Sequence, residues 1–173
     1  VTGASRGLGV ENAKSLAGLG YDIVMIAKDS SRLAQAQESL QRVHPNQHFT
    51  TYAVDLEDMQ TTRNGVAMIS QQHPAPEIMI LAHGVMSDKM SKTLKTNDAE
   101  WRRVMAINLD SVFTLVNGLV PAMVEARSGR IIIYSACLGR MSGPGNAGGL
   151  APYRISKAGV NALVRNLAHE TGL

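Results

Sequence analysis

The sequence predicts an α/β fold with a doubly wound parallel sheet, in which helices cover both faces of the sheet. Two observations support this fold class. Short, nearly continuous apolar runs alternate with longer stretches whose apolar residues recur at helical spacing, an alternation typical of βαβ units. The chain has 173 residues, of which 45% are hydrophobic and 18% charged. This composition suits one compact domain and excludes a mainly disordered chain.

Four apolar runs are predicted to be buried parallel strands, because each is short and bounded by helical patterns. They comprise residues 22–27, 49–54, 78–82 and 130–134, of which the second run is the more polar. Five stretches have helical periodicity and comprise residues 7–19, 31–43, 57–71, 97–123 and 153–170. Asn97, followed three residues later by Glu100, has the pattern of a capping box and predicts the start of the longest helix.

The two ends of the sequence suggest a domain truncated at both of them. Val1-Thr2-Gly3 opens within a motif, and Gly172-Leu173 follows directly after a helical pattern. We expect most of a first strand to precede Val1 and a further region to follow the last helix. Residues 1–173 are therefore interpreted as a single, partial domain.

Composition argues against several function classes. The 17 Lys and Arg give a net charge of only +3 and are scattered, which disfavours nucleic-acid binding. No apolar run approaches ~18 residues, so no membrane span is predicted. The single Cys137 excludes an intrachain disulfide framework and any metal site built from several cysteines. We therefore expect no metal site.

A glycine-rich opening is the first candidate binding site. Thr2-Gly3-Ala4-Ser5-Arg6-Gly7-Leu8-Gly9 places glycines at spacings of four and two before a predicted helix. Such glycines permit a tight turn and a close approach of the backbone to a pyrophosphate, while the helix N-terminus presents N–H groups to the anion. The motif alone is a weak signal, and a glycine-rich turn without a ligand remains the alternative.

Charged residues at two strand ends bear on the choice of nucleotide. Lys28 follows the strand at residues 22–27, where the ribose of a bound adenosine would lie. A basic residue there suits a 2′-phosphate and an acidic one a 2′-hydroxyl. Because Lys28 precedes Asp29, and Arg6 could approach the same phosphate, the sequence favours NADP over NAD. Asp55 could accept a hydrogen bond from an adenine amino group or cap the helix that follows.

Tyr153 and Lys157 lie four residues apart in a predicted helix, so their side chains share one face. A nearby ammonium stabilises a phenolate and lowers its pKa from about 10. Such a pair could exchange a proton with an oxygen atom during hydride transfer. The spacing is common, and a packed tyrosine beside a solvated lysine is the alternative interpretation.

Taken together and in this order, the motifs resemble those of the short-chain dehydrogenase/reductase family, whose members have an NAD(P)-binding Rossmann fold. The resemblance extends from Val1 to Leu173. The matching residues are the glycine-rich motif at positions 2–9, Asp55, Gly84 at a strand end, Asn108 in the long helix, Ser135 after a strand, Tyr153 and Lys157.

The resemblance implies an oxidoreductase that transfers a hydride between NADP(H), or alternatively NAD(H), and a small-molecule carbonyl/alcohol substrate. It implies that Tyr153 is the general acid/base and that Lys157 lowers its pKa and holds the nicotinamide ribose. Asn108, at a helix irregularity, would help a water chain feed protons to Lys157, and Ser135 would bond the substrate oxygen. The residues implied to bind the cofactor are Gly3, Ser5, Arg6, Gly7, Leu8, Gly9, Lys28, Asp55, Leu56, Ala82, Gly84, Tyr153 and Lys157.

The resemblance also implies properties of the whole protein. The helices at residues 97–123 and 153–170 form a dimer face in the family, so we expect a homodimer or homotetramer. A cytoplasmic location is expected, and the substrate lid would lie in the region after Leu173. The loop at residues 139–152 carries five Gly and two Pro and is either a pocket wall or a flexible insertion.

Two departures from the family pattern bear on activity. The family's Asn-Asn-Ala-Gly is replaced by Leu81-Ala82-His83-Gly84, so the asparagines that brace the central strand are absent. His83 is then either a polar substitute that faces the cofactor or an ordinary buried or partly exposed histidine.

The family's Ser-Ser-x-x-Gly is replaced by Ser135-Ala136-Cys137-Leu138-Gly139. Ala136 stands where the catalytic hydroxyl usually lies, and Ser135 points to the other face unless the strand end twists. Ser142 is a candidate substitute, and loss of the hydroxyl would cost on the order of 10²–10³ in turnover. The alternative function is therefore a weakly active or inactive dinucleotide-binding homologue that acts as a sensor or scaffold, and a structural subunit without cofactor is a third interpretation.

Overall fold

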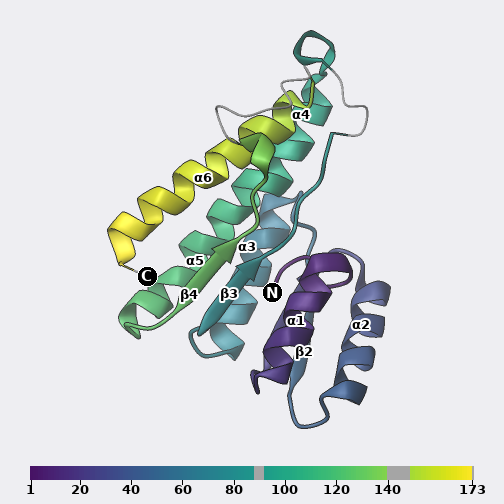
Figure 1. Cartoon of the computed structure of the whole chain (residues 1–173), viewed down its shortest axis with the longest axis vertical. Coiled ribbons are helices and arrows are strands. Elements are labelled where there is room, and N and C mark those ends of the chain that lie inside the picture. The colour runs from purple at the N-terminus through teal and green to yellow at the C-terminus, as the bar shows by residue number, and fades with distance from the viewer. Residues whose placement is uncertain (88–91, 140–148, 173) are drawn as a thin grey trace.

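The computed structural model describes residues 1–87, 92–139 and 149–172. Helices and strands alternate along the chain as the sequence predicts, and the helices cover both faces of a parallel sheet (Figure 1). The elements are α1 (Gly7–Gly18), β1 (Ile23–Ala27), α2 (Ser30–Val43), β2 (Phe49–Ala53), α3 (Met59–Gln72), β3 (Ile78–Leu81), η1 (Thr93–Lys95), α4 (Asp98–Met105), η2 (Ala106–Asp110), α5 (Ser111–Glu125), β4 (Arg130–Ile133), η3 (Cys137–Gly139) and α6 (Ala151–Thr171).

The sheet consists of two parallel ladders that Thr2 joins. β1 pairs with β2 from Ile23 opposite Phe49 onward, and β3 pairs with β4. Thr2 forms parallel bridges to Ile26 and to Leu81, and its N–H donates to the Ile80 carbonyl at 2.9 Å. The strand order is therefore β2-β1-Thr2-β3-β4. The order reverses at Thr2, which is the point where doubly wound sheets bind their ligands.

Two apolar cores lie on opposite faces of this sheet. Met25 of β1 packs with α1 and α2, whereas its neighbour Ile26 packs with residues of α3, α5 and α6. Successive strand residues point to opposite faces, so a strand buried on both sides is apolar throughout. This is the physical reason why residues 22–27 form a continuous apolar run.

β4 differs from the predicted strand that is buried on both faces. Ile131 and Ile133 pack against the core formed with α5 and α6, but Ile132 is 48% exposed. No helix among the described residues covers that side of β4 (Figure 1). The apolar run correctly predicts a strand, but only one of its faces is buried.

The longest predicted helix is divided into α4, one turn of π-helix (η2) and α5. The side chain of Asn97 accepts a hydrogen bond from the Glu100 N–H at 2.8 Å, so the predicted cap is present. The stretch Asp98–Glu125 is long and apolar enough to cross a membrane by length and composition, with a mean hydropathy of 1.4 over an 18-residue window. Its apolar side is buried in the core through Val112, Leu115 and Met123, which accounts for that hydropathy.

Candidate active site

The glycine-rich turn connects Thr2 to α1 at the carboxyl ends of the strands. Gly3 and Gly7 have φ angles of +65° and +56°, a region that other L-residues rarely adopt. A Cβ atom on Gly9 would lie 2.2 Å from the Gly3 carbonyl oxygen. These three positions therefore require glycine for the turn to fold back onto the start of the helix.

The start of α1 is built to receive an anion. Arg6 is the extended N-cap residue, and within the described part of the chain its side chain makes no capping hydrogen bond. The first-turn N–H groups of a helix lack intrahelical partners and carry its positive dipole end. Ser5 is half-buried, while Arg6 and Leu8 are exposed beside the turn. The geometry thus fits the pyrophosphate that the motif predicts.

At the end of β1, Lys28 forms an ion pair with Asp55, with Nζ and Oδ2 2.7 Å apart. The hydrogen bond to Asp55 and its negative charge raise the pKa of Lys28. Asp29 is engaged elsewhere, because its carboxylate caps α2 by accepting from the Arg32 N–H at 3.0 Å and pairs with the Arg32 side chain. Both charged residues after β1 are therefore paired, Lys28 with Asp55 and Asp29 with Arg32.

Asp55 does not cap the next helix. Its Oδ1 accepts from the Glu57 N–H at 3.0 Å, and Asp58 is the residue that caps α3. Leu56, between them, is buried in the core, so only its backbone is available to a cofactor. Ala82 is half-buried after β3.

Asn108 lies in the π-helical turn η2, at the helix irregularity that the resemblance implies. Its side chain is fully buried and grips the backbone beyond β3. Oδ1 accepts from the Val85 N–H at 2.8 Å, and Nδ2 donates to the Val85 carbonyl at 2.8 Å and to the Ser156 hydroxyl at 3.2 Å. Asn108 therefore joins the segment after β3 to α6.

Lys157 approaches the same segment from α6. Its side chain is buried, and Nζ donates to the Tyr134 carbonyl oxygen at 2.8 Å. A Cβ atom on Gly84 would lie 3.2 Å from this Nζ and 3.4 Å from Asn108 Oδ1. Burial lowers the pKa of Lys157. Gly84, Asn108 and Lys157 thus converge beside the glycine-rich turn.

Tyr153 lies one helical turn before Lys157 on α6 and is half-buried. The sequence predicts that Lys157 lowers the pKa of the Tyr153 phenol, but in this structure the pKa is shifted upward instead. Burial, reinforced by the nearby Cys137, raises the pKa of Tyr153. The ammonium of Lys157 is directed to the Tyr134 carbonyl, so Tyr153 is held in its protonated form.

Comparison of the sequence with models of protein families identifies the family of this chain. The model of the short chain dehydrogenases matches residues 1–172. The chain belongs to the short-chain dehydrogenase family. It is similar to the 3-oxoacyl-(acyl-carrier-protein) reductase FabG of Pseudomonas aeruginosa, with 31% identity over 172 residues, 99% of this chain and 66% of that protein. The chain thus spans slightly less than two thirds of the curated relatives that it matches.

Solved structures of family members have the same fold. A metagenomic short-chain oxidoreductase in complex with NADP superposes with a TM-score of 0.87 at 29% identity, covering 98% of this chain and 73% of that one. Carveol dehydrogenase from Mycobacterium avium in complex with NAD gives a TM-score of 0.85 at 27% identity, with 99% and 64% covered. The predicted Rossmann fold is confirmed, and the two complexes contain different nicotinamide cofactors.

The hydroxyl of Ser135, the first residue of the Ser-Ser-x-x-Gly pattern after β4, is already engaged in a hydrogen bond. Ser135 Oγ donates to the Lys157 carbonyl oxygen at 3.2 Å, so it bonds the backbone of α6. The next residue, Ala136, has no hydroxyl. Ser142, the candidate substitute, lies outside the described residues, as does most of the loop at residues 139–152.

His83 is a buried residue that bonds two neighbouring side chains, and its ring is not exposed at the glycine-rich turn. Its ring is buried, with Nδ1 2.6 Å from Thr2 Oγ1 and Nε2 2.9 Å from Ser111 Oγ. Burial, with a smaller contribution from the charge of Lys157, lowers the pKa of His83 to about 3. The histidine is therefore neutral and is part of the frame beneath the site.

Sequence reasoning missed one close approach that positions Lys157. A Cβ atom on Gly139 would lie 2.8 Å from the Lys157 carbonyl carbon and 2.9 Å from its Cβ. Gly139, the final glycine of the Ser-Ser-x-x-Gly pattern, is the signal that could have indicated this contact, because glycine permits a close approach of two backbones.

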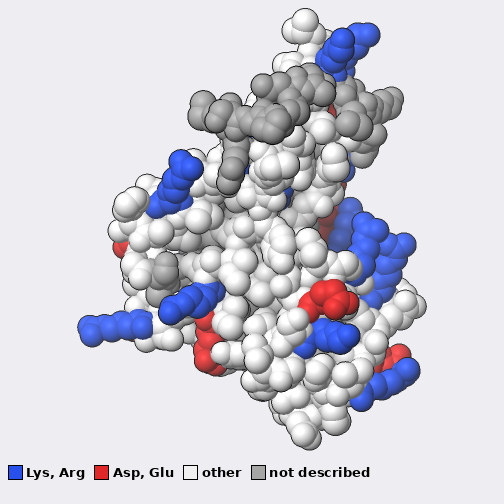
Figure 2. All heavy atoms as spheres, viewed as in Figure 1, with Lys and Arg blue, Asp and Glu red and all other residues white. Residues whose placement is uncertain are grey.

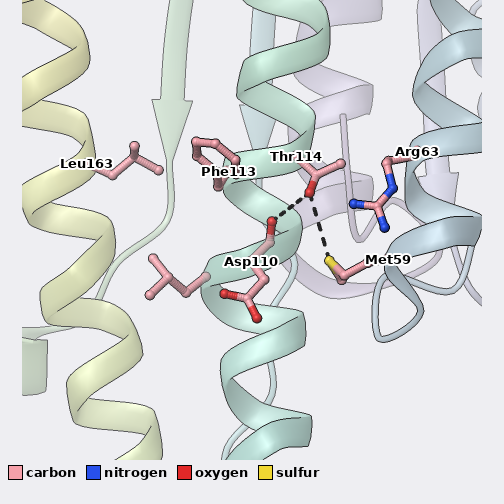
Figure 3. Close-up of a pocket in the computed structure, with 7 residues that line it drawn as sticks. Met59, Arg63, Asp110, Phe113, Thr114 and Leu163 are labelled. Carbon is pink, nitrogen blue, oxygen red and sulfur yellow. Dashed lines mark hydrogen bonds between the residues drawn. The ribbon is translucent and has the colours of Figure 1, made fainter.

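Two cavities lie outside the cluster of Gly84, Asn108 and Lys157, and the second extends to Thr2. One, of about 460 Å³, lies among α3, α5 and α6, where Figure 3 shows Arg63, Phe113 and Leu163 reaching it from the three helices. Another, of about 650 Å³, is lined by residues near the amino ends of the strands, such as Asp22 and Glu77. Neither contains the converging Asn108 and Lys157.

Proposed function

We propose that the protein is an NADP(H)-dependent oxidoreductase that transfers a hydride between the cofactor and the carbonyl or carbinol carbon of a small molecule. The observation that supports this most directly is the convergence of Lys157 and Asn108 on Gly84. This cluster lies beside the glycine-rich turn, at the carboxyl edge of the sheet. Catalysis of this kind needs a proton-transfer group next to a nucleotide site, and the cluster and the turn would supply them.

The residues present fit a dinucleotide. Gly3, Gly7 and Gly9 shape the turn, and Gly84 leaves room beside it for Lys157 Nζ and Asn108 Oδ1. The bound cofactor supplies or accepts the hydride. In reduction, protonated Tyr153 donates its phenolic proton to the substrate oxygen as the carbonyl carbon gains the hydride. Lys157 then stabilises the phenolate, and Asn108 holds the segment beside it.

The main test is NADPH oxidation by the full-length protein against a panel of aldehydes and ketones, with Tyr153→Phe beside it. The variant keeps the ring and loses the proton donor. Turnover is expected to fall by ~10²–10⁴ while NADPH binding, measured by calorimetry, is retained. Equal turnover by the two proteins would refute the proposed acid.

The preference for NADP over NAD is proposed from the charges at the end of β1. Lys28 is exposed there and pairs with Asp55, Asp29 is engaged by Arg32, and Arg6 is exposed in the glycine-rich turn. Figure 2 shows Lys and Arg side chains gathered on the side of the molecule where α2 begins. A cation at this place suits a 2′-phosphate.

The preference is tested with Lys28→Ala, with Lys14→Ala on the exposed side of α1 as the matched control. A charge-assisted contact of about 1.5 kcal/mol corresponds to a roughly tenfold loss of affinity. We expect that loss for NADPH, little change for NADH, and no change in Lys14→Ala. A loss shared equally by NADPH and NADH would contradict the assignment.

A second candidate function is a homologue that binds the dinucleotide but turns it over poorly, as a sensor or scaffold. It is favoured by Ala136 and by the engagement of Ser135 with the α6 backbone. The two functions are distinguished by Ala136→Ser. If the missing hydroxyl limits an otherwise complete enzyme, turnover is expected to rise by ~10²–10³. Tight NADPH binding with no turnover in either protein would select the second function.

We further propose that the chain forms a homodimer or homotetramer through α5 and α6. Phe113, Ile155 and Val164 are large apolar residues exposed on these helices, and the cavity of Figure 3 opens between them. Sedimentation of the full-length protein tests this, with Phe113→Asp expected to shift the population to monomers. The cytoplasmic location stays a prediction.

A further inference from the structure

The hydrogen atoms around His83 can be assigned from its partners. Ser111 has one hydroxyl hydrogen, and Oγ donates it to the Ile107 carbonyl oxygen at 2.7 Å. The contact between Ser111 Oγ and His83 Nε2 at 2.9 Å therefore requires the histidine to be the donor. This fixes the neutral tautomer with the hydrogen on Nε2.

The other ring nitrogen must then accept. Nδ1 lies 2.6 Å from Thr2 Oγ1, so the threonine hydroxyl donates to it. Thr2 Oγ1 in turn accepts from the Ala82 N–H at 3.2 Å. Hydrogen bonds thus run in one direction from the Ala82 N–H through Thr2, His83 and Ser111 to the Ile107 carbonyl. Such fully satisfied buried networks hold their members in one arrangement.

The position of this chain of hydrogen bonds relates it to the candidate site. Thr2 joins the two halves of the sheet and opens the glycine-rich turn. Ser111 begins α5 directly after the π-helical turn that carries Asn108. A Cβ atom on Gly3 would lie 3.2 Å from the Cα atom of His83, so the segment at residues 82–85 lies directly against the turn.

We propose that His83 is a positioning residue of the cofactor site. It fixes the segment at residues 82–85 between the glycine-rich turn and the Asn108 helix, in place of the asparagines that the family pattern carries at positions 81 and 82. Asn108 holds the far end of the same segment through Val85. The inference rests on the proposed function, since the segment matters to activity only if a nucleotide binds beside it.

The low pKa of His83, about 3, agrees with this role. A protonated ring would present two donors, and Thr2 would have to reverse its hydroxyl and lose its own donation. The positive charge of Lys157 contributes to the lowered pKa of His83. The neutral form therefore matches the one-donor, one-acceptor arrangement that links Thr2 to Ser111.

The test uses full-length protein with His83→Leu, which keeps much of the volume and removes both hydrogen bonds, and His83→Gln, which retains a donor and an acceptor. NADPH dissociation constants, KM and kcat are measured with thermal unfolding. We expect His83→Leu to weaken NADPH binding and raise its KM by about tenfold, as for one lost hydrogen bond to an aligned segment, with a smaller change in kcat. His83→Gln is expected to recover part of the affinity.

Ile69→Ala is the control for general destabilisation, because Ile69 is buried in the core on α3 and has no polar side-chain group that could join this network. It should lower the melting temperature and leave NADPH affinity unchanged. If His83→Leu does not fold, Ser111→Ala replaces it, since alanine suits a helix and leaves Nε2 without its acceptor.

Three results would overturn the inference. They are wild-type affinity in the His83→Leu protein, no recovery in His83→Gln, and an equal loss of affinity in Ile69→Ala. If the wild-type protein itself binds neither NADPH nor NADH, the proposed function fails and this inference fails with it. Wild-type binding with an unaffected His83→Leu variant refutes the role of His83 alone.

Discussion

Replacing Gly139 by alanine is predicted to disturb Lys157 through the backbone of α6. The added Cβ would lie 2.8 Å from the Lys157 carbonyl carbon, 2.9 Å from its Cβ and 3.0 Å from the Ala158 nitrogen. Ordinary van der Waals contact begins at 3.4 Å, so the two backbones must separate by about 0.6 Å (3.4 minus 2.8). No side-chain rotation relieves the contact, because two of the three atoms are main-chain atoms.

The cost follows from that displacement. Forcing an extra methyl group into a packed contact costs ~1–3 kcal/mol of stability. A misplacement of about 1 Å at a catalytic group costs on the order of 10² in rate, so a shift of this size should lower kcat/KM for NADPH-dependent reduction by roughly tenfold or more. Ser135 also bonds the Lys157 carbonyl, and its hydrogen bond would lengthen with the same movement.

The assay compares thermal unfolding and NADPH-dependent turnover of Gly139→Ala with those of Gly18→Ala. Gly18 is the last residue of α1, and a Cβ there would meet only His44 Cε1 at the ordinary distance of 3.7 Å. Alanine is favoured over glycine in helices by about 1 kcal/mol, so the control should be as stable as wild type or more so. Wild-type stability and turnover in Gly139→Ala would refute the argument from close packing.

The remaining predictions concern the same frame. Gly84→Ala places a Cβ 3.2 Å from Lys157 Nζ, the end of a flexible side chain, so kcat/KM should fall only several-fold with little change in melting temperature. Tyr134→Phe removes a bond of 3.0 Å to Asn12 and should lower the free energy of unfolding by about 1 kcal/mol in urea denaturation. His83, with its pKa lowered to about 3, takes up a proton in the unfolded chain below pH ~6.5 but not in the folded one. The free energy of unfolding should therefore fall by about 2 kcal/mol from pH 6.5 to 5 through this residue, and His83→Leu should remove that part of the dependence.

Much of the fold follows from patterns that are local in sequence. The run at residues 22–27 is apolar at each consecutive position from Ile23 to Ala27 because Met25 and Ile26 enter different cores. The same reasoning was wrong for one face of β4, where Ile132 is exposed. An apolar strand residue has the same identity whether or not another element covers it, so sequence pattern could not distinguish the two cases.

The site divides in the same way. Glycines at Gly3 and Gly7 and the spacing of Tyr153 and Lys157 satisfy requirements of one turn or one helix face, which a sequence displays directly. The partners of His83 are 81 and 28 residues away in sequence, and Ser135 meets Lys157 across 22 residues. Such contacts exist only after the sheet order and helix packing are set, so no local pattern contains them.

The pKa of Tyr153 shows how one such contact changes a chemical expectation. Helical spacing alone places an ammonium beside the phenol, which would lower the pKa of Tyr153. The Tyr134 carbonyl, from the end of β4, holds that ammonium at 2.8 Å, and burial of the phenol raises its pKa instead. A protonated phenol is the form that can donate to a carbonyl oxygen, as the proposed function requires of Tyr153.

Positions 135 and 136, after β4, bear on different requirements of the site. Position 135 concerns the support of its structure, and position 136 is where the family pattern carries the catalytic hydroxyl. Ser135 holds Lys157 in place through a hydrogen bond to the backbone of α6, and Asn108 holds the segment after β3 through Val85. Both contacts are complete although Ala136 offers no hydroxyl to a substrate. Under the proposed function, cofactor binding and carbonyl polarisation would therefore depend on different residues. Restoring a hydroxyl at position 136 should change turnover without changing NADPH affinity, and a change in both would show that the strand end couples them.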